Sequence, residues 1–249
     1  MKKYNGIEIG KLKKNFIIQN LFNDKYHYLI LNLKKNTKYI IKNINRGSIA
    51  IINTTNSKSK FFINKKKLDI QKYKFFGFNQ NFLEIQSSHK TLIAIAGVKM
   101  KILRKKIEKF EESEIYKVAK PWGYELWING ESEKYSFKKI FIKKGNRTSL
   151  QFHKKKIETN FLYKGSAQIT LSKKNGKNEK EQILKNLYKM KINSGNYVNV
   201  NNYAIHRLKA ISNITLYEVS TPHLDDVIRI ADDKKRKNGR INSEHTKAN

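Results

Sequence analysis

Strand-length runs of β-branched, aromatic and aliphatic residues recur along most of the chain and end at clusters of Asn, Lys, Gly and Ser. Runs of this kind, separated by turn-forming residues at roughly 8- to 12-residue intervals, are typical of β-sandwiches and barrels. The clearest are Tyr26 to Leu33 (YHYLILNL) and Thr91 to Val98 (TLIAIAGV). Because domains of about 100 residues are common, a chain of 249 residues has room for two of them. The pattern therefore predicts an all-β protein with two domains.

The strands predicted in the C-terminal half are short and numerous. They are Phe137 to Lys143, Ser149 to His153, Asn160 to Tyr163, Ala167 to Leu171, Gln182 to Ile192, Tyr197 to Val200, Arg207 to Ala210 and Thr215 to Val219. Short strands in this number, joined by Gly or Asn turns, fit a jelly-roll barrel.

Two stretches depart from the strand pattern. Lys101 to Glu114 (KILRKKIEKFEESE) has Leu103, Ile107 and Phe110 at helical spacing, which predicts an amphipathic linker helix, with a charged loop as the alternative. Asp232 to Asn249 has almost no apolar residues, which predicts a disordered tail. We therefore expect a β-domain over residues 1–100, a linker over 101–116, a second β-domain over 117–231 and a polar tail over 232–249.

The formal net charge of +33 raises the question of a nucleic-acid partner. The basic residues are mostly Lys, spread from end to end together with much Asn and Ile, which indicates a composition bias rather than a selected basic surface. We expect no nucleic-acid partner, but a field that attracts small anions such as sugar phosphates. With no cysteines, no apolar leader and no apolar stretch of about 18 residues, we expect a soluble, cytoplasmic protein without a membrane partner.

The segment Gly145 to Gly165 (GNRTSLQFHKKKIETNFLYKG) has the residue types and spacing of a metal site. Gln151 and His153 are two apart, so on one strand both side chains point to the same side of the sheet. Glu158 follows a short turn and can open the next strand, and His206 ends a later block, GNYVNVNNYAIH. An amide oxygen, a carboxylate and two imidazoles can bind a divalent metal ion and leave positions open for substrate. We predict these four residues as the metal ligands.

Both blocks resemble the signature motifs of the cupin superfamily. The first fits G-x5-[H/Q]-x-H-x4-E-x6-G at every fixed position, and this spacing separates the predicted ligands from histidines without such partners: His27, His89, His223 and His245. In the second block, Asn201 and Tyr203 stand where the superfamily usually has Pro and Gly. Because Tyr adopts a positive φ only at a cost, we expect the loop before His206 to differ from the usual one.

Residues from about 117 to 240 are similar to the C-terminal domain of type II mannose-6-phosphate isomerases. The resemblance rests on KPWGYE (Lys120 to Glu125), on the GNRTSLQFH centre and on TPHLDDVIRI (Thr221 to Ile230), and it weakens where Gly239 and Arg240 follow a basic insertion. It implies a cupin jelly-roll barrel in the C-terminal half.

The strands of the N-terminal half suggest a degenerate second cupin-like domain, which would make the chain a bicupin. Leu33, Lys35 and Ile40 fall at its ligand positions, so we expect no metal there. A small unrelated β-sandwich is the alternative.

The resemblance implies a metal-dependent isomerase that acts on mannose-6-phosphate or a related sugar phosphate, in carbohydrate or surface-polysaccharide biosynthesis. Such a reaction needs a Lewis acid, a base that moves a proton between C1 and C2, and cations that hold the phosphate. We expect zinc first, with manganese, iron, cobalt or nickel as alternatives. The candidate bases are Glu125 and Glu218, and the candidates for substrate binding are Arg147, Lys120, Arg207 and Arg229. A plainer explanation, as surface or salt-bridge residues, applies to Lys120, Arg207, Arg229 and Glu218.

Other functions stay open. One is another metal-cupin enzyme, such as an epimerase or an oxygenase, although oxygenase sites are more often rich in His. The other is a sugar-binding or regulatory cupin without turnover. The N-terminal half has no Gly-rich phosphate loop, so we expect none of the nucleotidyl transfer that larger bifunctional relatives perform. Edge strands would allow a homodimer.

Overall fold

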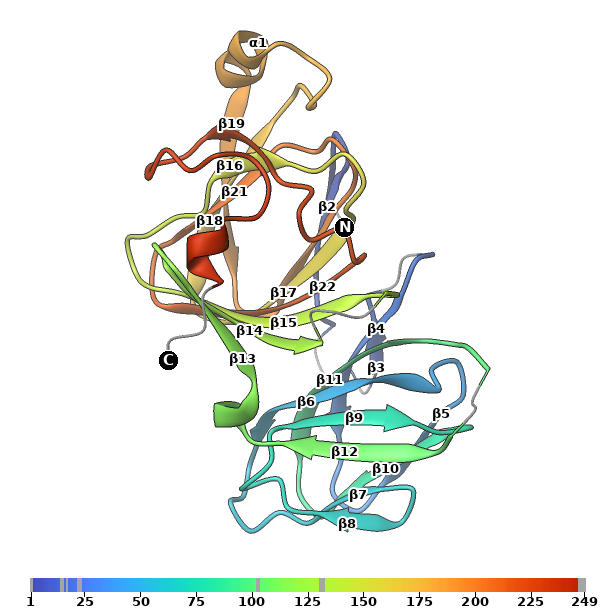
Figure 1. Cartoon of the computed structure of the whole chain (residues 1–249). Coiled ribbons are helices and arrows are strands. Elements are labelled where there is room, and N and C mark those ends of the chain that lie inside the picture. The colour runs from blue at the N-terminus through green and yellow to red at the C-terminus, as the bar shows by residue number, and fades with distance from the viewer. Residues whose placement is uncertain are drawn as a thin grey trace. The chain divides into compact units, whose positions relative to one another are not determined.

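The computed structural model describes residues 2–13, 16, 18–21, 24–101, 104–129 and 133–245. Antiparallel strands make up nearly all of its regular structure, which confirms the all-β prediction (Figure 1). The chain divides into an N-terminal unit, Lys13–Tyr116, and a C-terminal unit that joins Met1–Leu12 to Lys117–Asn249.

The N-terminal unit is a pair of β-sheets around an apolar core. One sheet has the order β12 (Lys106–Phe110), β9 (Phe75–Asn79), β6 (Arg46–Thr54), β11 (Thr91–Val98), β4 (His27–Leu33) and β3 (Ile18–Asn20). The other has the order β5 (Lys38–Ile41), β10 (Leu83–Ser87), β7 (Phe61–Ile63) and β8 (Lys66–Leu68). Inward-facing residues such as Leu31, Phe61, Phe76 and Ile95 are completely buried in one apolar cluster. Hydrophobic burial therefore stabilises this unit.

The C-terminal unit has two larger sheets. The first has the order β1 (Lys2–Tyr4), β2 (Ile7–Lys11), β20 (Asn196–Val200), β17 (Glu158–Lys164), β22 (Ile214–Ser220), β15 (Ser136–Ile142), β14 (Gly123–Asn129) and β13 (Tyr116–Lys120). The second has the order β19 (Leu187–Asn193), β18 (Ser166–Ser172), β21 (His206–Ala210), β16 (Leu150–Phe152) and β23 (Ile228–Ala231). Apolar residues including Ile142, Ile169 and Leu216 form its core.

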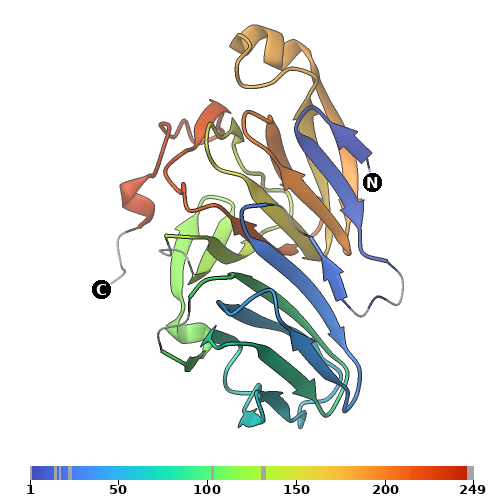
Figure 2. The same ribbon diagram turned by 90° about the vertical axis from the view of Figure 1, so that its right-hand side faces the viewer.

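The first strands of the chain belong to the C-terminal unit and not to the domain expected over residues 1–100. Strand β2 pairs with β20, so that Ile7 lies opposite Val200 and Ile9 opposite Val198. Both isoleucines are buried in the core of that unit. Figure 2 shows this dark-blue hairpin at the edge of the sheet.

The predicted linker helix over 101–116 is wrong. Residues Lys106–Phe110 form β12, which pairs with β9, and only Glu112–Glu114 (η1) form a short 3-10 turn. Pairing with a distant strand explains the difference. Ile107 lies opposite Phe78 and Phe110 opposite Phe75 of β9, and Ile107 packs against the apolar core. The predicted Leu103 lies outside the described residues.

Two further predictions are corrected in the C-terminal unit. Part of the strand predicted over Gln182 to Ile192 is helix α1 (Lys180–Lys185), and β19 begins only at Leu187. The tail predicted to be disordered is ordered over residues 232–245 and contains the 3-10 turn η2 (Asn242–Glu244). Its polar residues form ion pairs with one another and with the barrel, so the segment is ordered with few apolar contacts. Residues 246–249 lie outside the described residues.

Candidate metal centre

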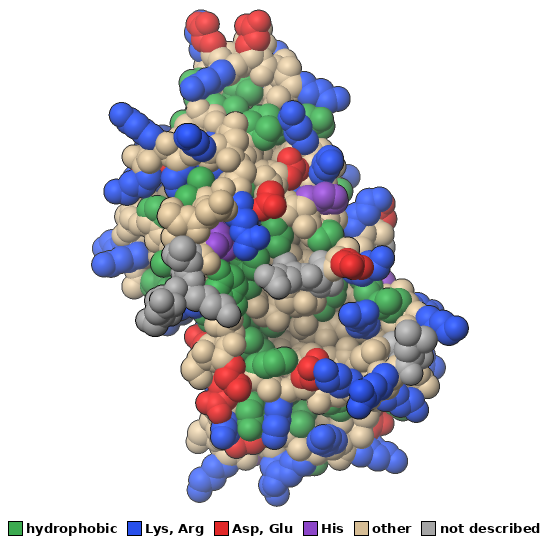
Figure 3. Space-filling view, viewed as in Figure 1, with side chains coloured by type: hydrophobic (Ala, Val, Ile, Leu, Met, Phe, Trp, Pro, Cys, Tyr) green, Lys and Arg blue, Asp and Glu red, His purple; other side chains and the backbone are tan. Residues whose placement is uncertain are grey.

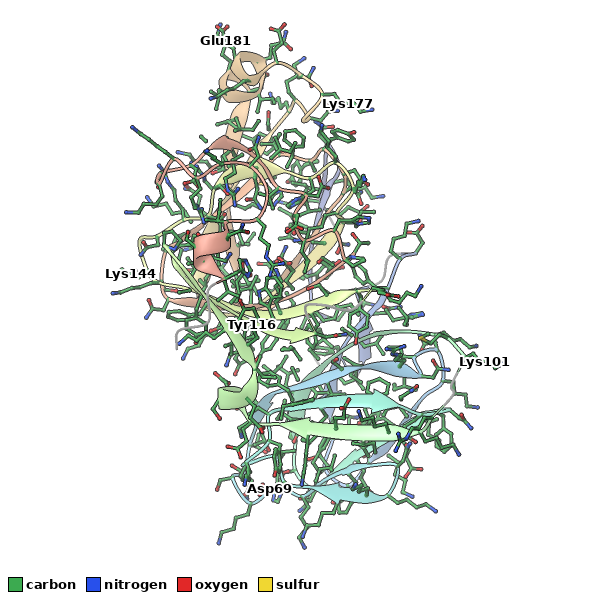
Figure 4. All side chains as sticks on the ribbon, viewed as in Figure 1. Asp69, Lys101, Tyr116, Lys144, Lys177 and Glu181 are labelled. Carbon is green, nitrogen blue, oxygen red and sulfur yellow. The ribbon has the colours of Figure 1, made fainter. Side chains whose placement is uncertain are left out.

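A cavity of about 130 Å³ lies within the C-terminal unit and is lined by both of its sheets. Part of its wall is apolar, with Ile142, Val198 and Leu216, and part is polar and charged. Eight of the residues predicted from the sequence line it: Lys120, Glu125, Gln151, His153, Glu158, His206, Glu218 and Arg229. Charged residues elsewhere on the unit, such as Lys144 and Lys177, point away from it (Figure 4).

Three predicted ligands converge inside this cavity. His153, Glu158 and His206 each offer a ligand atom, and these atoms lie within 4.8 Å of one another. Oε2 of Glu158 is 3.6 Å from Nε2 of His153, and Oε1 is 3.4 Å from Nε2 of His206. Strand ends bring the three together, because Glu158 opens β17, His206 opens β21 and His153 directly follows β16.

Backbone carbonyl groups fix the proton positions of both imidazoles. Nδ1 of His153 contacts the carbonyl oxygen of Asp226, and Nδ1 of His206 lies 3.0 Å from that of Ala204. A carbonyl oxygen only accepts hydrogen bonds, so each Nδ1 carries a proton and donates it. In a neutral imidazole with its proton on Nδ1, Nε2 then presents a lone pair, and both Nε2 atoms face Glu158.

This arrangement fits a metal ion. The Nε2 atoms of His153 and His206 are buried and have no hydrogen-bond partner among the described residues, although buried polar atoms are nearly always paired. Metal-binding histidines characteristically donate the other ring N–H to a carbonyl or carboxylate, as both do here. Burial, reinforced by Lys156, lowers the pKa of His153 to about 3, which keeps the imidazole in its neutral, metal-binding form. The cluster can thus hold a divalent metal ion.

Gln151, the predicted fourth ligand, lies beside the cluster. On the second sheet it is opposite His206 of β21 and Arg229 of β23. Its Oε1 accepts a hydrogen bond of 2.5 Å from Oγ of Ser149, which leaves the second lone pair of this oxygen for another partner. Its role as a ligand stays a prediction.

A buried lysine that the sequence reasoning missed lies between two carboxylates. Nζ of Lys156 is 2.5 Å from Oε2 of Glu158 and 2.9 Å from Oε1 of Glu218. Burial, with the charge of Glu158, raises the pKa of Glu218, whereas Lys156 holds the pKa of Glu158 well below its usual range against the effect of burial. In the sequence Lys156 belongs to a run of three lysines that is typical of an exposed turn, so nothing local identified it.

The register of the first sheet places further polar groups in one row. Trp127 lies opposite Lys138, Lys138 opposite Glu218, and Glu218 opposite Asn160. Nδ2 of Asn160 donates to Oε1 of Glu158 at 3.0 Å. Lys138 and Asn160 were not among the predicted site residues. Lys138 shares a strand face with the buried Ile140 and Ile142, and this spacing was a usable signal.

Glu125, the other candidate base, is firmly paired. Its Oε2 accepts hydrogen bonds from Nε1 of Trp127 at 2.8 Å and from Nζ of Lys138 at 3.2 Å. Burial acts to raise the pKa of Glu125, but the charges of Lys138 and Lys120 and the indole N–H lower it to about 2. This carboxylate is therefore charged at neutral pH.

The four predicted substrate-binding cations divide into two groups. Lys120 and Arg229 line the cavity, and Nζ of Lys120 lies 2.9 Å from Oε2 of Glu244. Arg147 instead lines a smaller pocket, where both arms of its guanidinium bind Asp233 at 2.7 Å. Arg207 is buried, lines neither pocket and donates to the carbonyl oxygen of Ala231 at 2.7 Å.

Residues 232–245, which we call the C-terminal segment, form one wall of the cavity. Arg236 binds Asp232 at 2.6 Å within the segment and also Glu244, at 2.9 Å. The ring of His245 lies 5.1 Å from that of Trp127 on β14. Figure 1 shows the red turn η2 beside β13 and β14, consistent with these contacts. The segment also brings Arg240 and Glu244 to the cavity.

The prediction that the loop before His206 would differ at Tyr203 is wrong. Tyr203 has φ +61°, the left-handed backbone region that a glycine would adopt. Its ring stacks on Phe152 at 6.0 Å, its N–H donates to the carbonyl oxygen of His153 at 2.7 Å, and Lys177 lies over its ring. These contacts offset a backbone cost of about 1–2 kcal/mol.

The chain has two β-domains, each built of two packed antiparallel sheets, and the second domain holds a buried His–Glu–His cluster. This combination defines the chain as a cupin of the two-domain kind. The family model described as "Mannose-6-phosphate isomerase C-terminal" matches residues 108–232, half of the chain. The chain belongs to this family. No match was found among curated proteins.

Solved structures share the fold at very low sequence identity. The protein YlbA from E. coli matches with a TM-score of 0.62 and 9% identity, over 88% of this chain and 93% of that one. Oxalate decarboxylase from Bacillus subtilis matches with a TM-score of 0.60 and 9% identity, over 92% and 80%. The formate complex of the Lactobacillus farciminis oxalate decarboxylase matches with a TM-score of 0.58 and 9% identity, over 92% and 89%. These likenesses extend across both domains and confirm the bicupin fold. No helix among the described residues is long and apolar enough to cross a membrane.

Proposed function

We propose that the C-terminal cavity holds a divalent metal ion and isomerises a phosphorylated hexose of the mannose-6-phosphate type. The observation that carries the proposal is the pair of buried Nε2 atoms, on His153 and His206, that face Glu158 with no other partner among the described residues. The family match over residues 108–232 supports the choice of substrate class. Zinc remains the first expectation, with Gln151 as the fourth ligand.

When bound, the metal would supply a Lewis acid that polarises the substrate carbonyl. Of the two candidate bases, Glu218 is the better proton acceptor, because its pKa is raised whereas that of Glu125 is about 2. Glu218 would take the proton from one carbon and return it to the neighbouring one. Lys156, at 2.9 Å, would hold its carboxylate in place. Glu125 instead positions Lys138 and Trp127 in the cavity wall.

The proposal is tested by metal analysis together with turnover. We expect purified protein to contain about one divalent ion per chain and to convert mannose-6-phosphate into fructose-6-phosphate. His153→Ala and His206→Ala should each weaken metal binding by more than about a hundredfold and abolish turnover, because each removes a ligand. Glu218→Gln should keep the metal and lose turnover.

His223→Ala is the matched control, since His223 is an exposed histidine of the same unit that does not line the cavity. It should keep both metal and activity. Metal bound without conversion would refute the isomerase and leave a sugar-binding cupin. Unchanged metal content in both ligand variants would refute the site itself.

We further propose that the positive charge serves small anions rather than nucleic acids. Lys and Arg side chains are scattered over the face shown in Figure 3 and do not gather over one element. We expect only weak duplex DNA binding at physiological salt. Tight binding that is independent of DNA sequence would contradict this expectation.

A further inference from the structure

The cavity cations differ in whether a carboxylate already neutralises them. Lys120 lies 2.9 Å from Glu244 and Lys138 lies 3.2 Å from Glu125. Three more cavity cations have carboxylate oxygens at 2.5 to 3.9 Å. Lys156 pairs with Glu158 and Glu218, Arg236 pairs with Asp232 and Glu244, and Arg229 lies near Asp232. Arg240 also lines the cavity but has no carboxylate within 4.0 Å among the residues that the structure describes.

The guanidinium of Arg240 is nevertheless held in place. It lies 5.6 Å from the ring centre of Trp127, and its Nη2 is 3.3 Å from Nδ1 of His245. A cation–π contact uses the face of the aromatic ring and takes up no N–H donor, so the donors of Arg240 that do not face His245 stay available to a ligand.

The backbone on both sides of Arg240 is also fixed. The N–H of Gly239 donates to the carbonyl oxygen of Val227 at 2.8 Å, and its own carbonyl accepts from Arg229 at 3.0 Å. Gly239 has φ +77°, a conformation that a side chain would disfavour. On the other side, Glu244 is bound by Lys120 and Arg236. The backbone around Arg240 is therefore held by contacts that do not involve its own charge, and Trp127 and His245 place its guanidinium.

The electrostatic surroundings favour an anion at this place. Burial, followed by the charges of Lys120 and Arg240, lowers the pKa of His245, as expected where the local potential is positive. A guanidinium that no carboxylate occupies suits the oxygens of a phosphate monoester, which can accept two parallel hydrogen bonds from such a group.

We propose that Arg240 binds the phosphate group of the substrate at the wall formed by the C-terminal segment, and so selects phosphorylated over free sugars. This inference rests on the proposed function for the substrate class and assigns it a recognition residue. Arg147, the first candidate from the sequence, is already bound to Asp233 by both arms of its guanidinium and does not line the cavity.

The test measures binding, by calorimetry, to the metal-loaded full-length protein. The ligands are mannose-6-phosphate, mannose and inorganic phosphate, and the variants are Arg240→Gln, Arg240→Lys and the control Lys237→Gln. Lys237 is exposed on the same segment and does not line the cavity. Because Arg240 is exposed, Arg240→Gln should fold normally, which an unchanged melting temperature would verify.

We expect Arg240→Gln to weaken mannose-6-phosphate binding about ten- to a hundredfold, to abolish inorganic phosphate binding and to leave mannose binding and metal content unchanged. Arg240→Lys should weaken mannose-6-phosphate binding less, since lysine keeps the positive charge but lacks the paired N–H donors of the guanidinium. Lys237→Gln should bind as the wild type does. Three results would each overturn the inference. The first is an Arg240→Gln variant that binds mannose-6-phosphate and inorganic phosphate as tightly as the wild type. The second is a variant that loses as much affinity for mannose as for mannose-6-phosphate, and the third is a wild type that binds no phosphate. If the wild type binds mannose-6-phosphate through Arg240 without converting it, the isomerase proposal fails and this inference stands.

Discussion

The two β-domains of this chain share a two-sheet architecture and differ in what lies between the sheets. In the N-terminal unit, Leu31, Phe61 and Phe76 fill the space between the sheets with apolar side chains. In the C-terminal unit, the corresponding space includes a cavity with charged groups such as Lys156 and Glu218. An apolar interior is stabilised by burial, whereas a polar interior is stable only while each group keeps its partner. One fold can thus be filled by apolar packing in one domain and enclose a charged cavity beside its apolar core in the other.

The largest expected effect is a loss of stability on opening a void in the apolar core of the N-terminal unit. Phe61→Ala should lower the free energy of unfolding of the N-terminal unit by about 3–5 kcal/mol, because Phe61 is completely buried and the variant leaves a void. Chemical denaturation measures the loss, and metal content per chain should stay unchanged. Phe82→Ala, at an exposed aromatic position of the same unit, should cost about 0.5 kcal/mol or less. A fall in metal content in Phe61→Ala would break the separation between the two interiors.

The second prediction tests the polar interior. Lys156→Met leaves two buried carboxylates, Glu158 and Glu218, without the cation that lies between them. The metal-free protein should lose about 3 kcal/mol of stability, and added metal should reduce the loss because it again supplies positive charge beside Glu158. Lys154→Met, an exposed neighbour, is the control. Equal stability of the two variants in denaturation would show that Lys156 is not required to compensate these charges.

The third prediction concerns the stability that Glu125 contributes and its loss at low pH. The pKa of Glu125 is about 2 in the folded protein and 4.5 in its ordinary state, so the folded form holds this proton less tightly. Its contribution is therefore present above pH 4.5 and is lost as the pH falls toward 2, with a limit of about 3 kcal/mol. Comparing wild type with Glu125→Gln by denaturation across this range isolates the contribution. Parallel stability curves for the two proteins would refute it.

The smallest effect concerns one backbone position. Tyr203 has φ +61°, so Tyr203→Gly should be more stable than Tyr203→Ala by about 1 kcal/mol, although both lose the ring that stacks on Phe152. Thermal denaturation of the pair measures this difference. An alanine variant as stable as the glycine variant would mean that the left-handed conformation is not retained without the ring.

Local motifs explain why much of the candidate site could be predicted. Side chains two apart on a strand share a face, so Gln151 and His153 could be assigned to one interior from the sequence alone. Glu158 and His206 followed from the spacing of the two blocks, and the structure brings three of the four together. The cupin motif also allowed the fold of the C-terminal half to be predicted, because the motif indicates where strands and turns lie.

The errors arose where distant partners decide the structure. Lys106–Phe110 is a strand because β9 pairs with it, and its short charged sequence fits a helix equally well. Arg147 lies at the expected place in the motif, yet Asp233, far along the chain, occupies its guanidinium. The C-terminal segment looked disordered because its stabilising contacts are ion pairs, which composition alone does not distinguish from solvated charge.

The pairing of β2 with β20 has a consequence for the order in which the chain folds. Gly10 and Asn196 are 186 residues apart in the sequence, yet they are joined across this pairing. At about 5–20 residues per second, the ribosome would need roughly 10–40 s to synthesise the partner of a hairpin that it has already released. The N-terminal unit is encoded entirely within this interval, so it can fold first. Strands β1 and β2 can therefore join their sheet only after the N-terminal unit and strand β20 have been synthesised.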